Sequence, residues 1–456
     1  MKLSRRNFLK GTALGGAGLL IKTPARAKFF RPRPNFIFIL SDDHRWDYLS
    51  CAGHPFLKTS ALDRLAKEGV RFTNAFVTTS LCSPSRASFL TGQYVHNHRI
   101  TRNGSLVGRL PRTFLELLQS AGYRTGFVGK WHIGGFKVPQ PKGVDYLVTF
   151  ISQGLYYNCP LIVQGKQVKS KKYITEELTD YAIKFLEQAR GSQPFFLYLS
   201  HKAVHAPFQP PEELKDLFQD QPIPLPPETE AKRVHPLFSF PHFPRVPSNE
   251  QLREVIRNYC ATIYKMDLEI SRLLQALEQM GLKDNTVVIY ASDNGYLWGE
   301  HRLVDKRWAY EESIRIPFLV RAPGIVRNPG REIDELVLNI DLAPTVLELA
   351  GISPPKSIQG KSFAPLLREK SFKWREDFLY EYFYDEYYNV PPMLAVRTRD
   401  WKYIRYRYHL RAEELYYLKE DPKEQNNLAS APEYQEQKQR LSQRLEQLLK
   451  ETRFKS

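Results

Sequence analysis

Residues 82–92 hold the most chemically specialised group of side chains in the sequence, Cys-Ser-Pro-Ser-Arg-Ala-Ser-Phe-Leu-Thr-Gly. Pro84 suits the first turn of a helix, because proline lacks the backbone N–H that would have no partner there. Cys82 or Ser83 would then cap this helix, beside free N–H groups and the positive end of its dipole. A helix start of this kind binds anions, and Arg86 adds a cation with a fork of donors. The pattern predicts a reactive side chain at an anion-binding site.

Four short apolar runs end just before further reactive residues. The runs lie at residues 35–40, 123–128, 194–199 and 286–290. The residues that follow them are Asp42 and Asp43, Lys130 and His132, His205, and Asp293 and Asn294. Short, continuous apolar runs are typical of strands that are buried on both faces.

Helical spacing of apolar residues separates these runs. It is clearest at residues 60–68, 113–120 and 249–280, and Gly281 stops the last of them. The alternation of strands and helices predicts an α/β fold with a large, mostly parallel sheet that has helices on both faces. Ligands bind beyond the carboxyl ends of the strands in such a sheet. We therefore expect the four sets of reactive residues to meet in one site.

Four of these residues offer only oxygen ligands, namely Asp42, Asp43, Asp293 and Asn294. Oxygen ligands favour Ca²⁺ or Mg²⁺ over Zn²⁺. The four cysteines are Cys51, Cys82, Cys159 and Cys260. No two of them are spaced as Cys-x-x-Cys, so a thiolate zinc site is not expected. If Cys82 is modified, at most one disulfide can form among the other three.

The run at residues 82–92 resembles the signature of the type I sulfatases and matches every fixed position of that pattern. In that family the cysteine is oxidised after translation to formylglycine, whose hydrated aldehyde is the nucleophile. For this chain the resemblance implies formylglycine derived from Cys82 and a maturation enzyme that generates it. It also implies one Ca²⁺ ion. The implied ligands are Asp42, Asp43, the modified Cys82, Asp293 and Asn294, with the substrate sulfate completing the shell.

The aldehyde hydrate would carry two hydroxyls on one carbon, and the resemblance implies that both are used. One hydroxyl attacks sulfur and releases the sugar alcohol, which leaves a sulfated enzyme. The other hydroxyl loses its proton and expels sulfate, which restores the aldehyde. The metal would act as a Lewis acid in both steps. A serine has one hydroxyl and has no such second step.

Further segments resemble the same family and imply roles for other residues. Residues 129–132 read Gly-Lys-Trp-His, so Lys130 would contact sulfate and the nucleophile, while His132 would hold the hydrate and act as a base. His205 begins a His-x-Pro segment and would contact sulfate and protonate the leaving group. Lys306 would be a second sulfate-binding cation. The complete set of expected catalytic residues is Cys82, Arg86, Lys130, His132, His205 and Lys306.

Each of these residues has a more ordinary explanation when it stands alone. A single lysine is most often a solvated charge, a single histidine a hydrogen-bonded structural residue, and a single arginine a salt-bridge partner. Their shared position after strand ends favours a common site. We expect His44 and His301 to support that site. Arg302 stands where the family often has glycine, and we expect it to affect only a loop on the substrate side.

The resemblance covers nearly all of residues 34–430 and implies an alkaline-phosphatase-like fold. After about residue 370 the pattern changes to strand-like alternation at residues 394–408 and an amphipathic stretch at 431–452. We therefore expect a sulfatase catalytic domain at residues 28–370. A C-terminal α+β subdomain, with a small antiparallel sheet and one helix, is expected at residues 371–456.

Residues 1–27 match a twin-arginine signal peptide. Arg5 and Arg6 precede an apolar segment at residues 11–21, and residues 25–27 form an Ala-x-Ala cleavage site. The apolar segment is too short for a permanent membrane span, so we expect a bacterial protein that is periplasmic or secreted. Residues 219–247 are rich in proline and are expected to form a long ordered loop on the surface.

The chain has 456 residues and a formal net charge of +17, a balance often found in proteins that bind polyanions. No zinc-finger, RNP or P-loop pattern is present, so no nucleic acid partner is expected. A sulfated sugar substrate agrees with both the charge and the signature. Residues 94–98, Tyr-Val-His-Asn-His, resemble the matching stretch of N-acetylglucosamine-6-sulfatases and indicate 6-O-sulfated glucosamine in a glycosaminoglycan or mucin-type glycan. The alternative is that this histidine pair only orders a loop.

Two other functions remain open from the sequence. Sulfate and phosphate monoesters share a shape, so a phosphonate or phosphodiester hydrolase of the same superfamily is one of them. The other is a non-catalytic polyanion-binding protein with a relic site. The complete set of expected catalytic residues argues against this second alternative.

Overall fold

The computed structural model describes residues 33–454, apart from residues 105–109, 136–139, 192, 228–246, 370–372, 386–387, 389 and 408–411. The signal peptide expected at residues 1–27 lies outside the described residues. Most of the proline-rich loop expected at residues 219–247 lies outside them as well.

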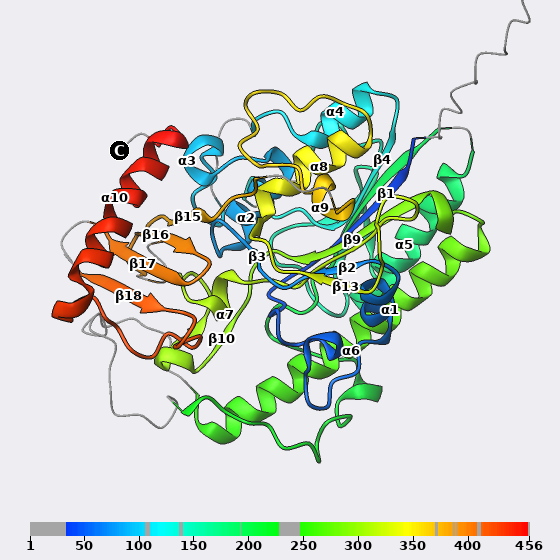
Figure 1. The fold of residues 1–456 in the computed structure, drawn as a ribbon. Helices are drawn as coiled ribbons and strands as arrows, with labels where there is room; N and C mark the ends of the chain where they lie inside the picture. The colour runs from blue at the N-terminus through cyan, green and yellow to red at the C-terminus, as the bar shows by residue number, and fades with distance from the viewer. Residues whose placement is uncertain are drawn as a thin grey trace, which may run out of the picture. The chain divides into compact units, whose positions relative to one another are not determined.

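A ten-stranded mixed sheet forms the centre of the described chain (Figure 1). In spatial order its strands are β13 Arg331–Ile333, β2 Val70–Phe72, β12 Phe318–Arg321, β9 Thr286–Ser292, β1 Asn35–Ser41, β8 Phe195–Ser200, β4 Arg124–Lys130, β5 Tyr146–Phe150, β6 Pro160–Val163 and β7 Lys166–Lys169. The run β9-β1-β8-β4-β5 is parallel throughout. Antiparallel pairs occur on either side of it, at β12, β6 and β7. The predicted parallel sheet is confirmed at its centre, while its outer parts are mixed.

Strand register aligns the carboxyl ends of the four predicted strands. Leu40 of β1 pairs with Ser200 of β8, which also pairs with Gly129 of β4. On the other side of β1, Ser41 pairs with Ser292 of β9. The reactive residues that follow these strands therefore start from one edge of the sheet, as the sequence predicted. The strands β4 and β9 extend two residues beyond the apolar runs, so Lys130 is itself a strand residue.

Two apolar cores lie on opposite faces of the sheet, because alternate residues of β1 point to different cores. Phe36 and Phe38 join the first core, whereas Ile37 and Ile39 join the second. The helices that pack in the first core are α2 Cys82–Thr91, α4 Phe114–Ser120, α8 Leu342–Leu349 and α9 Ala364–Leu367. Those of the second are α1 Ser60–Glu68, α5 Ile174–Ala189 and α6 Asn249–Gln279 (Figure 1). Helices on both faces were predicted, and this prediction is confirmed.

A smaller antiparallel sheet follows near the C-terminus. Its strands, in spatial order, are β15 Asp377–Tyr382, β16 Met393–Thr398, β17 Trp401–Tyr406 and β18 Glu413–Tyr417. The final helix, α10 Gln435–Glu451, packs on β15, β16 and β17. The predicted small sheet with one helix is confirmed, and the domain boundary at residues 370–371 stays a prediction. The short elements are α3 Val95–His98, α7 Glu311–Ile314, the paired strands β3 Ala75–Phe76 and β14 Val337–Leu338, and the paired strands β10 Leu297–Trp298 and β11 Val304–Asp305.

Gly129, the residue before Lys130 in the sequence, allows β4 and β8 to approach each other closely. Its φ is +116°, and a Cβ added there would lie 1.8 Å from the backbone oxygen of Ser200. We expect Gly129→Ala to lower the free energy of unfolding by about 3 kcal/mol, since positive-φ strain and overpacking act together. Gly165→Ala is the matched control, because Gly165 has φ +79° and no atom within 4 Å of the added Cβ. It should cost only about 1–2 kcal/mol. Equal losses in urea unfolding of the two variants would contradict the packing argument.

Candidate active site

Cys82 is the first residue of α2, and its side chain is buried at the carboxyl edge of the sheet. The prediction that Cys82 or Ser83 caps this helix is wrong, because the cap is Leu81, whose carbonyl accepts the N–H of Ser85 at 2.8 Å. Ser83 instead donates its hydroxyl to the carbonyl of His132. Its backbone N–H donates to Oδ1 of Asn103 at 3.0 Å. The start of α2 is therefore held by its neighbours, while the Cys82 thiol is left to face the site.

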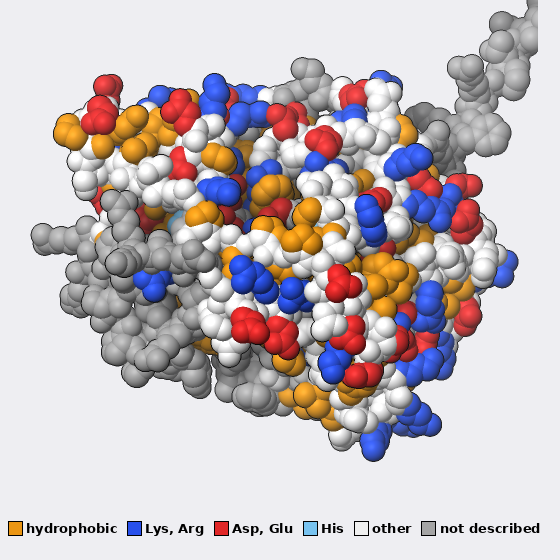
Figure 2. Space-filling view, turned by 90° about the horizontal axis from the view of Figure 1, so that it is seen from below, with side chains coloured by type: hydrophobic (Ala, Val, Ile, Leu, Met, Phe, Trp, Pro, Cys, Tyr) orange, Lys and Arg blue, Asp and Glu red, His pale blue; other side chains and the backbone are white. Residues whose placement is uncertain are grey.

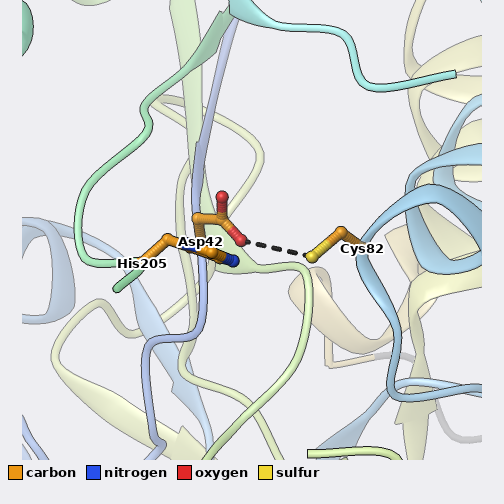
Figure 3. A group of neighbouring side chains, drawn as sticks. All are labelled: Asp42, Cys82 and His205. Atoms are coloured by element: carbon orange, nitrogen blue, oxygen red, sulfur yellow. Dashed lines mark hydrogen bonds between the residues drawn. The ribbon is translucent and has the colours of Figure 1, made fainter. Parts of the chain in front are cut away.

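The side chains of Asp42, Cys82 and His205 point toward one another from three separate elements (Figure 3). Asp42 follows β1, Cys82 begins α2, and His205 lies in the segment after β8. The Cys82 thiol donates to Oδ1 of Asp42 at 3.6 Å. The predicted nucleophile and a predicted metal ligand, which lie forty positions apart in the sequence, are thus direct neighbours.

Three buried carboxylates gather beside Cys82. One oxygen from each of Asp42, Asp43 and Asp293 lies within 4.8 Å of the others. Burial and the nearby Asp42 raise the pKa of Asp293 to about 7. So much negative charge away from water is costly unless cations compensate for it.

Two buried oxygen atoms at this cluster are available as ligands for a hard cation. Oδ2 of Asp43 and Oδ1 of Asn294 are buried, and neither has a hydrogen-bond partner among the described residues. The Asn294 amide N–H groups donate to Oδ1 of Asp43 at 2.7 Å and to the Gly295 carbonyl at 2.8 Å. These bonds orient the amide and leave its oxygen available. The residues present therefore fit an oxygen-coordinated divalent cation.

Three buried cations surround the carboxylates. Arg86 donates from Nε to Asp293 at 2.9 Å, and from a terminal nitrogen to the Lys130 carbonyl at 2.8 Å. Lys130 donates to Asp42, and Lys306 donates both to Asp43 and, at 3.3 Å, to the sulfur of Cys82. Burial alone would raise the pKa of Asp42, but Lys130, with smaller contributions from other cations, holds this pKa well below its ordinary value.

Burial favours the neutral ring of both site histidines. Burial, reinforced by Lys130, lowers the pKa of His132 well below its ordinary value, and its Nδ1 has no partner among the described residues. Burial also lowers the pKa of His205. Because a carbonyl only accepts, Nδ1 of His205 must donate to the Ala206 oxygen 2.8 Å away. Its Nε2, which is 3.8 Å from Asp43, is therefore an acceptor in the neutral ring and a donor only when the ring is charged.

Two further histidines, which were expected to support the site, contact tyrosine residues. His44 hydrogen-bonds through both ring nitrogens, to the Tyr290 hydroxyl at 2.5 Å and to the Tyr48 carbonyl at 2.9 Å. His301 stacks on the ring of Tyr310 with their centroids 3.8 Å apart. These contacts hold both rings in place, and the expected supporting roles of the two histidines stay a prediction.

Gln153 is a site residue that the sequence reasoning missed. It follows β5, a fifth parallel strand that ends at the same edge of the sheet, and its Oε1 accepts from Nζ of Lys130 at 2.5 Å. The signal available was the strand-like run at residues 146–150, which continues the series of strands with polar residues after them. Gln153 and Asp42 together fix the position of the Lys130 ammonium group.

We expect Gln153→Ala to lower kcat/KM for a sulfate ester by about tenfold, because a hydrogen bond to a charged group is lost. Lys130→Ala should cost about 10²–10³-fold, as removal of a group that stabilises transition-state charge does. Gln167→Ala, at an exposed position of β7, is the matched control and should leave the rate unchanged. Steady-state kinetics of the three variants test this, and a Gln153→Ala enzyme with wild-type kinetics would refute the positioning role.

The histidines of residues 94–98 lie at the opposite end of α2 from Cys82. His96 binds the Glu381 carboxylate at 2.7 Å and the Thr452 carbonyl at 2.8 Å. The ring of His98 hydrogen-bonds the Ser88 hydroxyl at 3.0 Å. Both rings are therefore held by neighbouring elements, in agreement with the alternative that this pair orders the chain locally.

Two further observations on the described residues concern disulfides and membrane spans. Cys51, Cys82, Cys159 and Cys260 are all free, so no disulfide joins them. Among the described helices, none is long and apolar enough to cross a membrane.

Comparison with known proteins identifies the family and agrees with the fold. A sequence model described as Sulfatase matches residues 34–352, and one described as N-sulphoglucosamine sulphohydrolase, C-terminal, matches residues 299–451. The chain belongs to the sulfatase family, has the alkaline-phosphatase-like fold and is a sulfuric ester hydrolase. A model of the twin-arginine signal sequence matches residues 2–21, so the chain is exported to the periplasm or beyond.

Two similar proteins are named as N-acetylglucosamine sulfatases. The N-acetylglucosamine-6-O-sulfatase of Bacteroides thetaiotaomicron is 32% identical over 92% of this chain and 87% of its own length. The N-acetylglucosamine-6-sulfatase of Homo sapiens is 35% identical over 77% of this chain and 67% of its own length. A solved structure of a protein in complex with its substrate D-glucosamine-2-N,6-O-disulfate is similar with a TM-score of 0.87, at 30% identity, and covers 92% of this chain and 98% of that one.

Proposed function

We propose that this sulfatase removes sulfate from a sulfated carbohydrate, and that 6-O-sulfated glucosamine in a glycosaminoglycan or mucin-type glycan is its preferred sugar. The observation that carries the proposal is the contact of Cys82 with both Asp42 and Lys306, at the carboxyl edge of the sheet. The sugar is supported by the names of the two relatives and by the disulfated glucosamine in the similar solved structure.

We propose that one Ca²⁺ binds to Asp42, Asp43, Asp293 and Asn294, together with an oxygen on residue 82. The support is the oxygen-only donor set and the two buried oxygens that have no partner among the described residues. When bound, the ion supplies Lewis-acid chemistry, neutralising a sulfate oxygen and lowering the pKa of the attacking hydroxyl.

Cys82 is proposed to be converted to formylglycine. As a thiol it is a poor nucleophile, because burial raises its pKa to about 12 and the thiolate is absent at neutral pH. The hydrated aldehyde supplies two hydroxyls on one carbon. The thiol is fully buried in the folded chain, so a maturation enzyme must act before α2 packs. Twin-arginine export carries folded proteins, so this order places the conversion in the cytoplasm.

The other site residues have separate roles toward the substrate. Lys130 and Lys306 bind the sulfate oxygens, while Arg86 holds Asp293 and the end of β4 in place. His132 is neutral and accepts the proton of a hydroxyl on residue 82. The anionic substrate favours the charged ring of His205, whose Nε2 then donates to the leaving oxygen.

The proposed function is tested by comparing kcat/KM for an aryl sulfate and an aryl phosphate, and then for glucosamine sulfated at O6, O3 or N. We expect the aryl sulfate to be preferred over the phosphate, and the 6-O-sulfate over the other two positions. A preference for the phosphate would favour the phosphonate or phosphodiester hydrolase. Binding of glycan without turnover by formylglycine-containing enzyme would favour the non-catalytic alternative.

A further inference from the structure

An open groove of about 1580 Å³ lies at the end of α2 that is remote from Cys82. Gln93 and Tyr94, which follow α2, line it, and the ten residues of this helix separate them from Cys82 by about 15 Å. One wall is α10, and the other is formed by residues 356–361 and 373–378. Figure 1 shows α10 and α3 next to each other at this side of the chain.

The groove is larger than a site for a small molecule. Pockets for drug-sized ligands have volumes of about 300–1,000 Å³, so this groove has room for several sugar rings. It is also open rather than enclosed, because much of its lining is exposed, including Arg440 and Lys373. An extended chain could therefore lie along it.

Several cations without an ion pair to another described residue line this groove. Five exposed basic residues line it without an ion pair to another described residue, namely Lys356, Lys361, Lys373, Arg440 and Arg453. The lining has eight basic and five acidic residues in all, so it is positive overall. Figure 2 shows one face of the molecule, on which basic and acidic side chains are interspersed.

The remaining lining favours a glycan over a nucleic acid. Glu335, Glu376 and Asp400 also line the groove, and their carboxylates can accept hydrogen bonds from the hydroxyl groups of sugar rings, which a DNA strand lacks along its length. The amides of Gln437, Gln443 and Gln447 on α10 suit hydroxyl groups, since each offers both donors and an acceptor. Trp374 and Trp401 also line the groove and supply partly exposed aromatic surface for sugar rings.

The walls of the groove are tied together, so the surface is formed in advance of binding. The Thr452 carbonyl at the end of α10 accepts hydrogen bonds from Gln359 at 2.8 Å, Asn97 at 3.0 Å and His96 at 2.8 Å. On the same helix, Arg444 pairs with Asp377 at the start of β15. A surface that is already ordered loses less conformational entropy when a ligand binds.

We propose that this groove is a second binding site for an anionic polysaccharide, which holds a polymeric substrate while its sulfate esters are hydrolysed at residue 82. The proposal rests on the proposed function for the identity of the polymer. Two sites on one chain raise the effective concentration of the glycan at the active site. Long substrates should therefore gain affinity that short ones cannot.

The test reverses the charge of the exposed residues Lys356, Lys373 and Arg440 together, each to Glu. In a Cys82→Ala background, we expect calorimetry to show about tenfold weaker binding of a heparin octasaccharide, because each exposed ion pair adds a small increment. Binding of the disaccharide should be unchanged. In active enzyme, kcat/KM should fall for the octasaccharide and stay constant for an aryl sulfate.

The matched control reverses three exposed lysines away from the groove, Lys166, Lys169 and Lys184, each to Glu. An equal loss of affinity in this control, or no loss in the groove variant, would overturn the proposal. Single-stranded DNA of equal charge that binds as tightly and competes fully would overturn the assignment to a glycan. Because the Cys82→Ala arm measures binding alone, failure of the sulfatase proposal would not be confused with failure of the groove.

Discussion

Replacement of Cys82 by serine is expected to lower kcat for a sulfate ester by at least about 10³-fold, the scale seen when a catalytic nucleophile is removed. Serine is close in size to cysteine, so the packing at the start of α2 is preserved. Its single hydroxyl can accept a sulfate but has no second hydroxyl with which to release it. The measurement is turnover of an aryl sulfate by enzyme from a host whose maturation enzyme acts on cysteine.

Cys51→Ser is the matched control. Cys51 is partly exposed, and its backbone N–H donates to Asp63, which is not a residue of the site. It should retain wild-type kcat. Far-ultraviolet circular dichroism of Cys82→Ser should match the wild type, which separates a chemical loss from misfolding. A serine variant with unchanged turnover would reject the proposed use of two hydroxyls.

Removal of divalent cations is the second change with a large expected effect. Chelation should lower kcat/KM by at least about 100-fold, because a Lewis acid contributes several kcal/mol of charge stabilisation. It should also lower Tm, because an ion present at 100 times its Kd stabilises the folded state by about 2.7 kcal/mol. Without the ion, Asp42, Asp43 and Asp293 rely on Lys130, Lys306 and Arg86 alone for compensation. Added Ca²⁺ should restore both activity and Tm.

Asp293→Asn tests the same site through the protein. Asparagine keeps the shape of the side chain but removes one of the three clustered charges. We expect this variant to lose the rise in Tm that Ca²⁺ produces, whereas Asp284→Asn, at an exposed position, should keep it. Full activity of wild-type enzyme in chelator, at the Tm measured in Ca²⁺, would argue against a bound ion.

The strands that build the site were predictable because their burial leaves a simple trace in the sequence. A strand covered on both faces is apolar at nearly every position. β1 and β8 are buried along their whole lengths, and only their end residues Asn35, Ser41 and Ser200 are polar. The carboxyl ends of neighbouring parallel strands share an edge, so the positions of Asp42 and Asp293 followed from the pattern alone. Lys306 follows no such strand, and only the family resemblance placed it in the site.

The wrong and missing predictions concern contacts that the local sequence does not determine. The cap of α2 is Leu81 rather than a polar residue, because the Ser83 hydroxyl is used by the His132 carbonyl. Gln153 was missed because glutamine after a strand is common, and only the fold brings it against Lys130. His96 could not be assigned from sequence, because its partner Glu381 lies almost three hundred residues away on β15.

The central claim is tested most directly by mass spectrometry of the peptide that contains residue 82. The measurement is made on preparations of known specific activity. We expect a peptide in which one oxygen replaces the sulfur and two hydrogens of cysteine. We also expect specific activity to rise in proportion to the converted fraction. A preparation with full activity in which residue 82 is entirely unmodified cysteine would contradict the account.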